Sequence, residues 1–133
     1  MKANITEYLR INLDNEMWEC RRCDGTLTAA SDNYKRGLLV YDRDPREIHP
    51  PLLDPEKYDY TFSPDPAYTA LLEYYCPHCG TMVETEYTAP GHPPVHDIEL
   101  DLESLRHKVS QWGDSPGSPE IPDVERPRHV HRH

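Results

Sequence analysis

Apolar and polar side chains alternate over short stretches of the chain, which is the pattern of half-buried β-strands. Residues 8–13 show this alternation, Asp14-Asn15 then offers a turn, and residues 16–20 read as the return strand. We therefore predict an N-terminal hairpin. The alternative is a short N-terminal helix, because Asn4 and Glu7 have the spacing of a capping box.

Further strands are predicted in the middle of the chain. Residues 71–76 and 81–88 are rich in β-branched and aromatic side chains and are joined by a tight turn, so they predict a second hairpin. Residues 37–41 read as a buried strand and residues 97–100 as a further short strand. Between the two hairpins, residues 32–36 predict a helical turn.

Helical periodicity is clearest near the C-terminus. Asp101 has the character of an N-cap, and Leu102, Leu105 and Val109 share one face at helical spacing. We predict one C-terminal helix, which ends near Trp112.

Proline concentrates in two long segments. Residues 44–66 carry six prolines, whose missing N–H groups exclude both a helix interior and a central strand. Tyr58, Tyr60 and Phe62 alternate within this extended insertion, which favours docking on a surface. Residues 113–133 carry four more prolines and few apolar side chains, so we expect a tail that is either partner-bound or disordered.

All four cysteines occur in two Cys-x-x-Cys pairs, Cys20-Arg21-Arg22-Cys23 and Cys76-Pro77-His78-Cys79. Such pairs each supply two thiolates from one tight loop, and four thiolates complete the tetrahedral coordination of Zn²⁺. We predict a structural zinc site made of Cys20, Cys23, Cys76 and Cys79, with no open position for substrate. Iron bound as in a rubredoxin is an alternative. The 52 residues between the pairs exceed the usual spacing, although long loops close at small extra entropic cost.

The predicted fold is a small β-rich (α+β) domain, a zinc ribbon with two Cys-x-x-Cys knuckles, one C-terminal helix and long proline-rich extended segments. It occupies residues 1–112, with the extended insertion 44–66, and is followed by the tail 113–133. Only 36% of the residues are hydrophobic, so the core is thin and needs a metal or a partner. We expect positive φ angles after each knuckle, at Asp24-Gly25 and at Gly80.

A thiol oxidoreductase is an alternative use of Cys76-Pro77-His78-Cys79. Such enzymes place the first cysteine at a helix N-terminus, which lowers its pKa, whereas the residues after Cys79 predict a strand. We interpret His78 as a solvated or interface side chain rather than a fifth ligand. No catalytic residue can be assigned from the sequence.

The chain is acidic, with a formal net charge of −10. Residues 42–103 contain 14 acids against three bases, a balance of −11. This charge argues against phosphate-binding partners and anionic membranes, and therefore against the alternative of a free-standing zinc-ribbon adaptor for nucleic acid or transcription proteins. No signal peptide and no apolar run of about 18 residues is visible, so a reducing cytoplasm is expected.

An ordered set of motifs resembles the small gamma subunits of the acetone and acetophenone carboxylases. The motifs are Ile5-Thr6-Glu7-Tyr8-Leu9, Trp18-Glu19-Cys20-Arg21-Arg22-Cys23, Asn33-Tyr34-Lys35, Arg43-Asp44-Pro45, Tyr75-Cys76-Pro77-His78-Cys79-Gly80 and His96-Asp97-Ile98-Glu99-Leu100-Asp101. The resemblance covers about residues 5–108 and is closer to the acetophenone enzyme, since the chain is short for an acetone carboxylase subunit. Asp24 departs from the usual Cys-x-x-Cys-Gly and leaves the ligands in place.

The resemblance implies a heteromeric, ATP-dependent ketone carboxylase. Its larger subunits would be similar to hydantoinases and ATP-dependent oxoprolinases, would bind ATP with Mg²⁺ or Mn²⁺, and would phosphorylate the ketone enol and bicarbonate. Joining these would give a β-keto acid such as benzoylacetate from acetophenone. The present chain would contribute zinc and an extended contact surface, and the resemblance places no catalytic residue on it.

Overall fold

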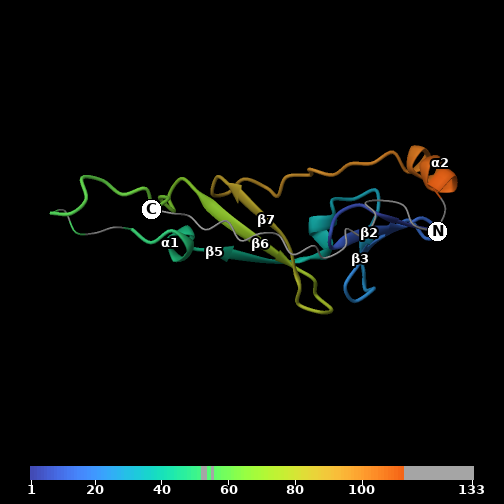
Figure 1. Ribbon diagram of the computed structural model, residues 1–133, viewed down its shortest axis with the longest axis horizontal. Coiled ribbons are helices and arrows are strands. Elements are labelled where there is room, and N and C mark those ends of the chain that lie inside the picture. Colours follow the sequence, from blue (N-terminus) through green and yellow to red (C-terminus); the bar gives the residue numbers. More distant parts are fainter. Residues whose placement is uncertain (52–53, 55, 113–133) are drawn as a thin grey trace, which may run out of the picture.

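The computed structural model describes residues 1–51, 54 and 56–112. Two antiparallel sheets lie one after the other along an elongated molecule, with α2 at one end and the proline-rich insertion at the other (Figure 1). The predicted tail, residues 113–133, lies outside the described residues.

The first sheet has four strands in the order of the chain. They are β1 (Lys2–Asn4), β2 (Leu9–Asn12), β3 (Met17–Cys20) and β4 (Thr26–Ala29). The hairpin of β2 and β3 confirms the prediction, with Ile11 opposite Trp18. The alternative N-terminal helix is wrong, because β1 extends the sheet and places Ala3 opposite Ile11. The strand β4 was not predicted, because its side chains are at most partly covered and show no clear alternation.

The second sheet has three strands, β5 (Leu39–Arg43), β6 (Ala70–Tyr75) and β7 (Met82–Thr88), also in chain order. The hairpin of β6 and β7 confirms the prediction. The prediction of a buried strand at residues 37–41 is wrong in its burial, since Leu39, Val40 and Tyr41 are about half exposed. The reason is their place in the sheet: β5 is an edge strand, so its side chains have neighbouring strand residues on one side alone.

Two predictions about extended segments need correction. The insertion 44–66 begins with a helical turn, α1 (Pro45–Ile48), which the prolines permit because Pro45 occupies its first position. The backbone N–H of Arg46 donates to the Asp44 carboxylate at 2.9 Å and caps this turn. Residues 97–100 form no strand. The connection from β7 to α2 instead makes polar contacts with side chains, as described below.

The remaining helices agree with the sequence pattern. The 3₁₀ turn η1 (Tyr34–Gly37) matches the predicted helical turn, and α2 (Leu102–Trp112) matches the predicted C-terminal helix. The Asp101 carboxylate accepts hydrogen bonds from the backbone of Glu103 and Ser104, at 3.1 and 3.2 Å, and so caps α2. In the described part of the chain, no helix has the length and hydropathy needed to cross a bilayer.

One small core lies between the first sheet, η1 and α2. Its largest buried members are Trp18, Tyr34, Tyr74, Leu9, Ile11 and Val109. The ring centroids of Trp18 and Tyr34 are 5.6 Å apart. Because Tyr74 comes from β6, the second sheet also contributes to this core, and the two sheets are packed together at their junction.

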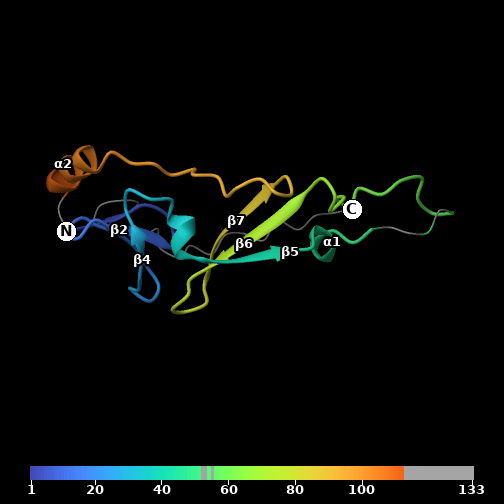
Figure 2. The same ribbon diagram turned by 180° about the vertical axis from the view of Figure 1, so that it is seen from behind.

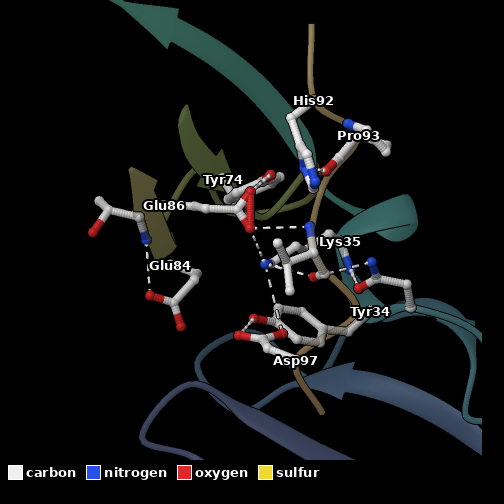
Figure 3. Close-up of polar contacts among 11 residues, drawn as sticks. Tyr34, Lys35, Tyr74, Glu84, Glu86, His92, Pro93 and Asp97 are labelled. Carbon is white, nitrogen blue, oxygen red and sulfur yellow. Dashed lines mark hydrogen bonds and ion pairs between the residues drawn. The ribbon is translucent and has the colours of Figure 1, made fainter. Parts of the chain in front are cut away.

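A buried lysine joins the two sheets beside this core (Figure 3). The side chain of Lys35, on η1, is 2% exposed, and its Nζ lies 2.7 Å from Glu86 Oε1 on β7. Nζ also donates to the carbonyl of Val95 at 2.8 Å and lies 3.6 Å from Asp97 Oδ1. We call Lys35, Glu86, Val95 and Asp97 the Lys35 cluster. It fastens η1, β7 and the connection that leads to α2.

Aromatic rings and carboxylates complete the surroundings of this lysine. Its Nζ lies 5.3 Å from the ring centroid of Tyr74 and 5.8 Å from that of Tyr34. Burial raises the pKa of Glu86, but the hydrogen bonds from Lys35 and the Val95 N–H outweigh it and hold that pKa below its usual value. Burial and the nearby Glu86 carboxylate raise the pKa of Tyr74 to about 12. Glu86 is therefore ionised and Tyr74 neutral near pH 7.

Replacing Lys35 with methionine should destabilise the protein strongly. The substitution K35M removes the cation and leaves the Glu86 carboxylate, whose side chain is 10% exposed, without its main partner. Breaking a buried ion pair in this way costs about 3–5 kcal/mol. Urea unfolding with zinc supplied in excess would measure the loss.

Two further variants make this prediction specific. Lys108 lies exposed on α2, so K108M should change the free energy of unfolding by less than about 0.5 kcal/mol. The double variant K35M/E86L removes both charges and should be more stable than K35M alone. A K35M protein as stable as the wild type would show that the Lys35 cluster contributes nothing.

Candidate metal centre

Each Cys-x-x-Cys pair forms the turn of a hairpin. Cys20 ends β3 and the first pair leads into β4, whereas the second pair joins β6 to β7. The two turns are built alike. The backbone N–H of the first cysteine donates to the carbonyl five residues later, at 2.9 Å in both cases. That cysteine's carbonyl accepts from the N–H four residues later, again at 2.9 Å in both.

Positive φ angles close both turns, as the sequence predicts. Asp24 has a φ of 63° and Gly80 a φ of 75°. These residues hold equivalent positions, each directly after the second cysteine of its pair. Asp24 carries the side-chain penalty of this conformation, and its carboxylate accepts a 2.6 Å hydrogen bond from Arg10 on β2. Arg10 also donates to the buried Glu19 at 2.8 Å, so the first turn is tied to its own sheet.

The two turns bring the four thiols together, although they come from different sheets. All four Sγ atoms lie within 4.8 Å of one another. Across the two pairs, Cys20 and Cys79 are 3.9 Å apart and Cys23 and Cys76 are 3.7 Å apart. Sulfurs bound at about 2.3 Å to one Zn²⁺ lie about 3.8 Å apart along the edges of a tetrahedron. All four cysteines are free, and the arrangement could hold a metal ion such as zinc.

Within each Cys-x-x-Cys pair, the first cysteine is more buried than the second. Cys20 and Cys76, the first cysteine of each pair, are buried, whereas Cys23 is partly covered and Cys79 is exposed. Burial raises the pKa of the Cys20 thiol. A backbone hydrogen bond from Gly25 lowers the pKa of Cys23, but burial and the neighbouring thiols raise it overall to about 12. A metal ion bound by these two cysteines would have to displace their protons, because thiolates are the ligating form.

Cys79 differs from the other thiols. The Cys79 thiol donates to Thr81 Oγ1 at 3.1 Å, and hydrogen bonding with the side chain and the backbone of Thr81 lowers the pKa of Cys79 to about 6. The helix required by the oxidoreductase alternative is nevertheless missing, because β7 follows the pair. Hydrogen-bond donors beside a thiolate equally suit a metal ligand.

His78 connects the second turn to the first hairpin. Its ring Nε2 lies 2.8 Å from the carbonyl oxygen of Thr26, the first residue of β4. The side chain of His78 is exposed, and it lies outside the group of four cysteines that could hold a metal ion. Gly25 provides the space for the ring, since a Cβ atom there would overlap His78 Cδ2. Sequence reasoning missed this contact because the two residues lie 53 positions apart.

The geometry defines a small β-rich protein of the zinc-ribbon type, in which two hairpins from separate sheets present four cysteines to one point. The chain belongs to the acetone carboxylase gamma subunit family, whose family model matches residues 3–110. The resemblance seen in the sequence motifs is thereby confirmed.

Two relatives show the same relationship. The chain is 43% identical over 110 residues to the acetophenone carboxylase beta subunit of Aromatoleum aromaticum, with 83% of each chain covered. It is 31% identical over 93 residues to the acetone carboxylase gamma subunit of Xanthobacter autotrophicus, covering 68% of this chain and 52% of that subunit. The acetophenone carboxylase relative is named beta rather than gamma, so the letter of the subunit differs between the two enzymes.

Alanine at position 25 should destabilise the contact between the two turns. In G25A the new Cβ displaces the His78 ring and breaks its hydrogen bond to Thr26, at a cost of about 1 kcal/mol. The free energy of unfolding of G25A, H78A and G25A/H78A would form a double-mutant cycle. We expect the G25A substitution to cost clearly less in the H78A background, and equal costs in the two backgrounds would contradict the assignment.

Proposed function

We propose that this chain is the small zinc-binding structural and assembly subunit of a heteromeric ATP-dependent ketone carboxylase, a C–C bond-forming ligase whose catalysis takes place on larger subunits. One observation carries the proposal. Four thiols from two separate sheets converge at the spacing of a zinc tetrahedron, in a chain of the acetone carboxylase gamma subunit family.

The donor set supports a structural role for the metal. Cys20, Cys23, Cys76 and Cys79 would complete the coordination of one zinc ion as thiolates and leave no position for water or substrate. Bound zinc would supply a charge that holds the four thiolates together and would connect the two hairpins. The free energy of such sites is folding free energy, about 10–16 kcal/mol in small zinc peptides. In this proposal residues 1–112 form the zinc-ribbon domain.

The reaction is assigned by family rather than by residues of this chain. We infer acetophenone as the ketone, with bicarbonate and ATP as co-substrates and benzoylacetate as product. The higher identity to the acetophenone carboxylase subunit, 43% against 31%, supports this choice over acetone. ATP and Mg²⁺ or Mn²⁺ would bind to the larger subunits, which we expect to resemble hydantoinases and ATP-dependent oxoprolinases.

Charge and redox chemistry support the remaining parts of the proposal. A net charge of −10 disfavours nucleic acid as a partner, so the expected partners are proteins. Four free cysteines would stay available to zinc in a reducing compartment such as the cytoplasm, where disulfides do not compete.

Replacing the second pair should remove zinc and prevent assembly. In C76S/C79S the site loses two of four thiolates, so we expect less than one tenth of the wild-type zinc content and no stable complex with the larger subunits. Elemental analysis of the purified chain and size-exclusion chromatography of the co-expressed complex would measure both. The experiment should begin from the complex purified from the native host, with every co-purifying subunit identified by mass spectrometry.

His78 offers the matched control within the same turn. H78A leaves all four cysteines in place, so it should retain one zinc per chain and assemble normally. Normal assembly and normal carboxylation with a zinc-free C76S/C79S chain would refute the proposed role of the metal.

A further inference from the structure

The proline-rich insertion presents bare aromatic rings. We define residues 56–68 as the aromatic arm; Tyr60, Phe62 and Tyr68 are 67, 82 and 79% exposed within it, and Tyr58 is 42% exposed. Large aromatic side chains lose favourable burial when they face water, and interfaces are enriched in them. Figures 1 and 2 show the insertion projecting at the end of the molecule opposite α2, away from the core. No fold requirement explains these rings.

The arm is nevertheless held in a defined shape by local bonds. Tyr60 and Phe62 pack edge to face, with ring centroids 5.0 Å apart and planes at 83°. The Ser63 hydroxyl donates to the His49 carbonyl at 2.6 Å, which joins the outgoing and returning parts of the insertion. The Asp65 carboxylate accepts from the Ala67 N–H at 2.9 Å and fixes the next turn. Such order before binding reduces the entropy that an interface must overcome.

Exposed apolar side chains continue from the arm onto the second sheet. Ile48 on α1 is 51% exposed, and Leu39, Val40 and Tyr41 on β5 are 49–58% exposed. Three consecutive apolar residues exposed on both faces of an edge strand are a liability in an unpartnered protein. In the part of the chain that the structure describes, β5 pairs only with β6, so its outer edge is available. Ile48 and Phe62 line the same hollow and α1 directly follows β5 in the chain, so the arm and the edge strand present neighbouring exposed apolar side chains.

Charge identifies the chemistry of the occupant. The arm carries three acids, Glu56, Asp59 and Asp65, against Lys57 alone, and residues 42–103 as a whole carry a balance of −11. Two such surfaces would repel each other, so a second copy of this chain is disfavoured as occupant. A complementary surface combines an apolar groove with lysines and arginines at its rim.

We propose that the aromatic arm, together with the edge of β5, docks into an apolar groove with a basic rim on a larger subunit of the carboxylase. This inference rests on the proposed function and specifies which surface makes the assembly contact. Tyr60 and Phe62 are the anchors that enter the groove, whereas the acids of the arm steer and orient the encounter.

Truncating the two anchors tests the proposal. We expect Y60S/F62S to bind the larger subunits at least about tenfold more weakly than the wild type, which corresponds to one lost hot spot or more. Its zinc content and melting temperature should be unchanged, since both rings lie outside the core. The binding partner is the set of larger subunits purified from the native host after deletion of this chain, and surface plasmon resonance gives the affinity.

Two further variants separate the contribution of the two anchor rings to binding from the contribution of the arm's charges. Tyr87 is 54% exposed on β7, at the other edge of the sheet, so Y87S should bind as the wild type does. E56Q/D59N removes two charges of the arm and should slow association and weaken its dependence on salt.

The outcomes distinguish a failure of the proposed docking surface from a failure of the proposed function. Wild-type binding together with unchanged binding by Y60S/F62S would overturn the docking surface and leave the proposed function intact. If the wild-type chain itself fails to bind the larger subunits, the proposed function fails. A homodimer of the isolated chain that Y60S/F62S dissociates in sedimentation velocity would overturn the proposal in favour of a second copy.

Discussion

The meeting of four sulfur atoms at one point is the constraint on which this structure depends. Each sheet is small, with four and three short strands, and neither encloses a core of its own. The two knuckles present Cys20 and Cys79, and Cys23 and Cys76, at 3.9 and 3.7 Å, so each hairpin supplies half of a tetrahedron. Thiols so placed repel one another as thiolates unless a cation lies between them, and the site therefore couples metal binding to the relative position of the sheets.

A second connection between the sheets depends on charge instead of thiol chemistry. Lys35 reaches from η1 to Glu86 on β7 and to the carbonyl of Val95, and Tyr74 of β6 enters the core beside it. Among the described residues, no buried side-chain nitrogen or oxygen lacks a hydrogen-bond partner, so this cluster is a complete network. Both the cysteine cluster, which could hold a metal ion, and the buried ion pair of Lys35 and Glu86 bring together residues that are distant in the sequence.

The molecule divides its surface accordingly. Trp18 and Tyr34 are buried beside the first sheet and Tyr74 of β6 is buried with them, whereas the outer strands β5 and β7 and the aromatic arm carry exposed large side chains. The exposed apolar surface of this member of the acetone carboxylase gamma subunit family therefore lies mainly on the outer strands of the second sheet and on the proline-rich insertion.

Local patterns in the sequence determined the knuckles, the hairpins of β2–β3 and β6–β7, and the capped helix α2. Each depends on residues close together in the chain, such as the Cys-x-x-Cys spacing, the positive φ of Asp24 and Gly80, and the Asp101 cap. Only the tertiary structure decided which segments pair with each other and which side chains are buried. Residues 39–41 are exposed at a sheet edge, and β1 and β4 pair with β2 and β3. Residues 97–100 form no strand, and His78 packs over Gly25. Burial and long-range pairing depend on neighbours distant in sequence, and alternation along a strand carries no information about which neighbours those are.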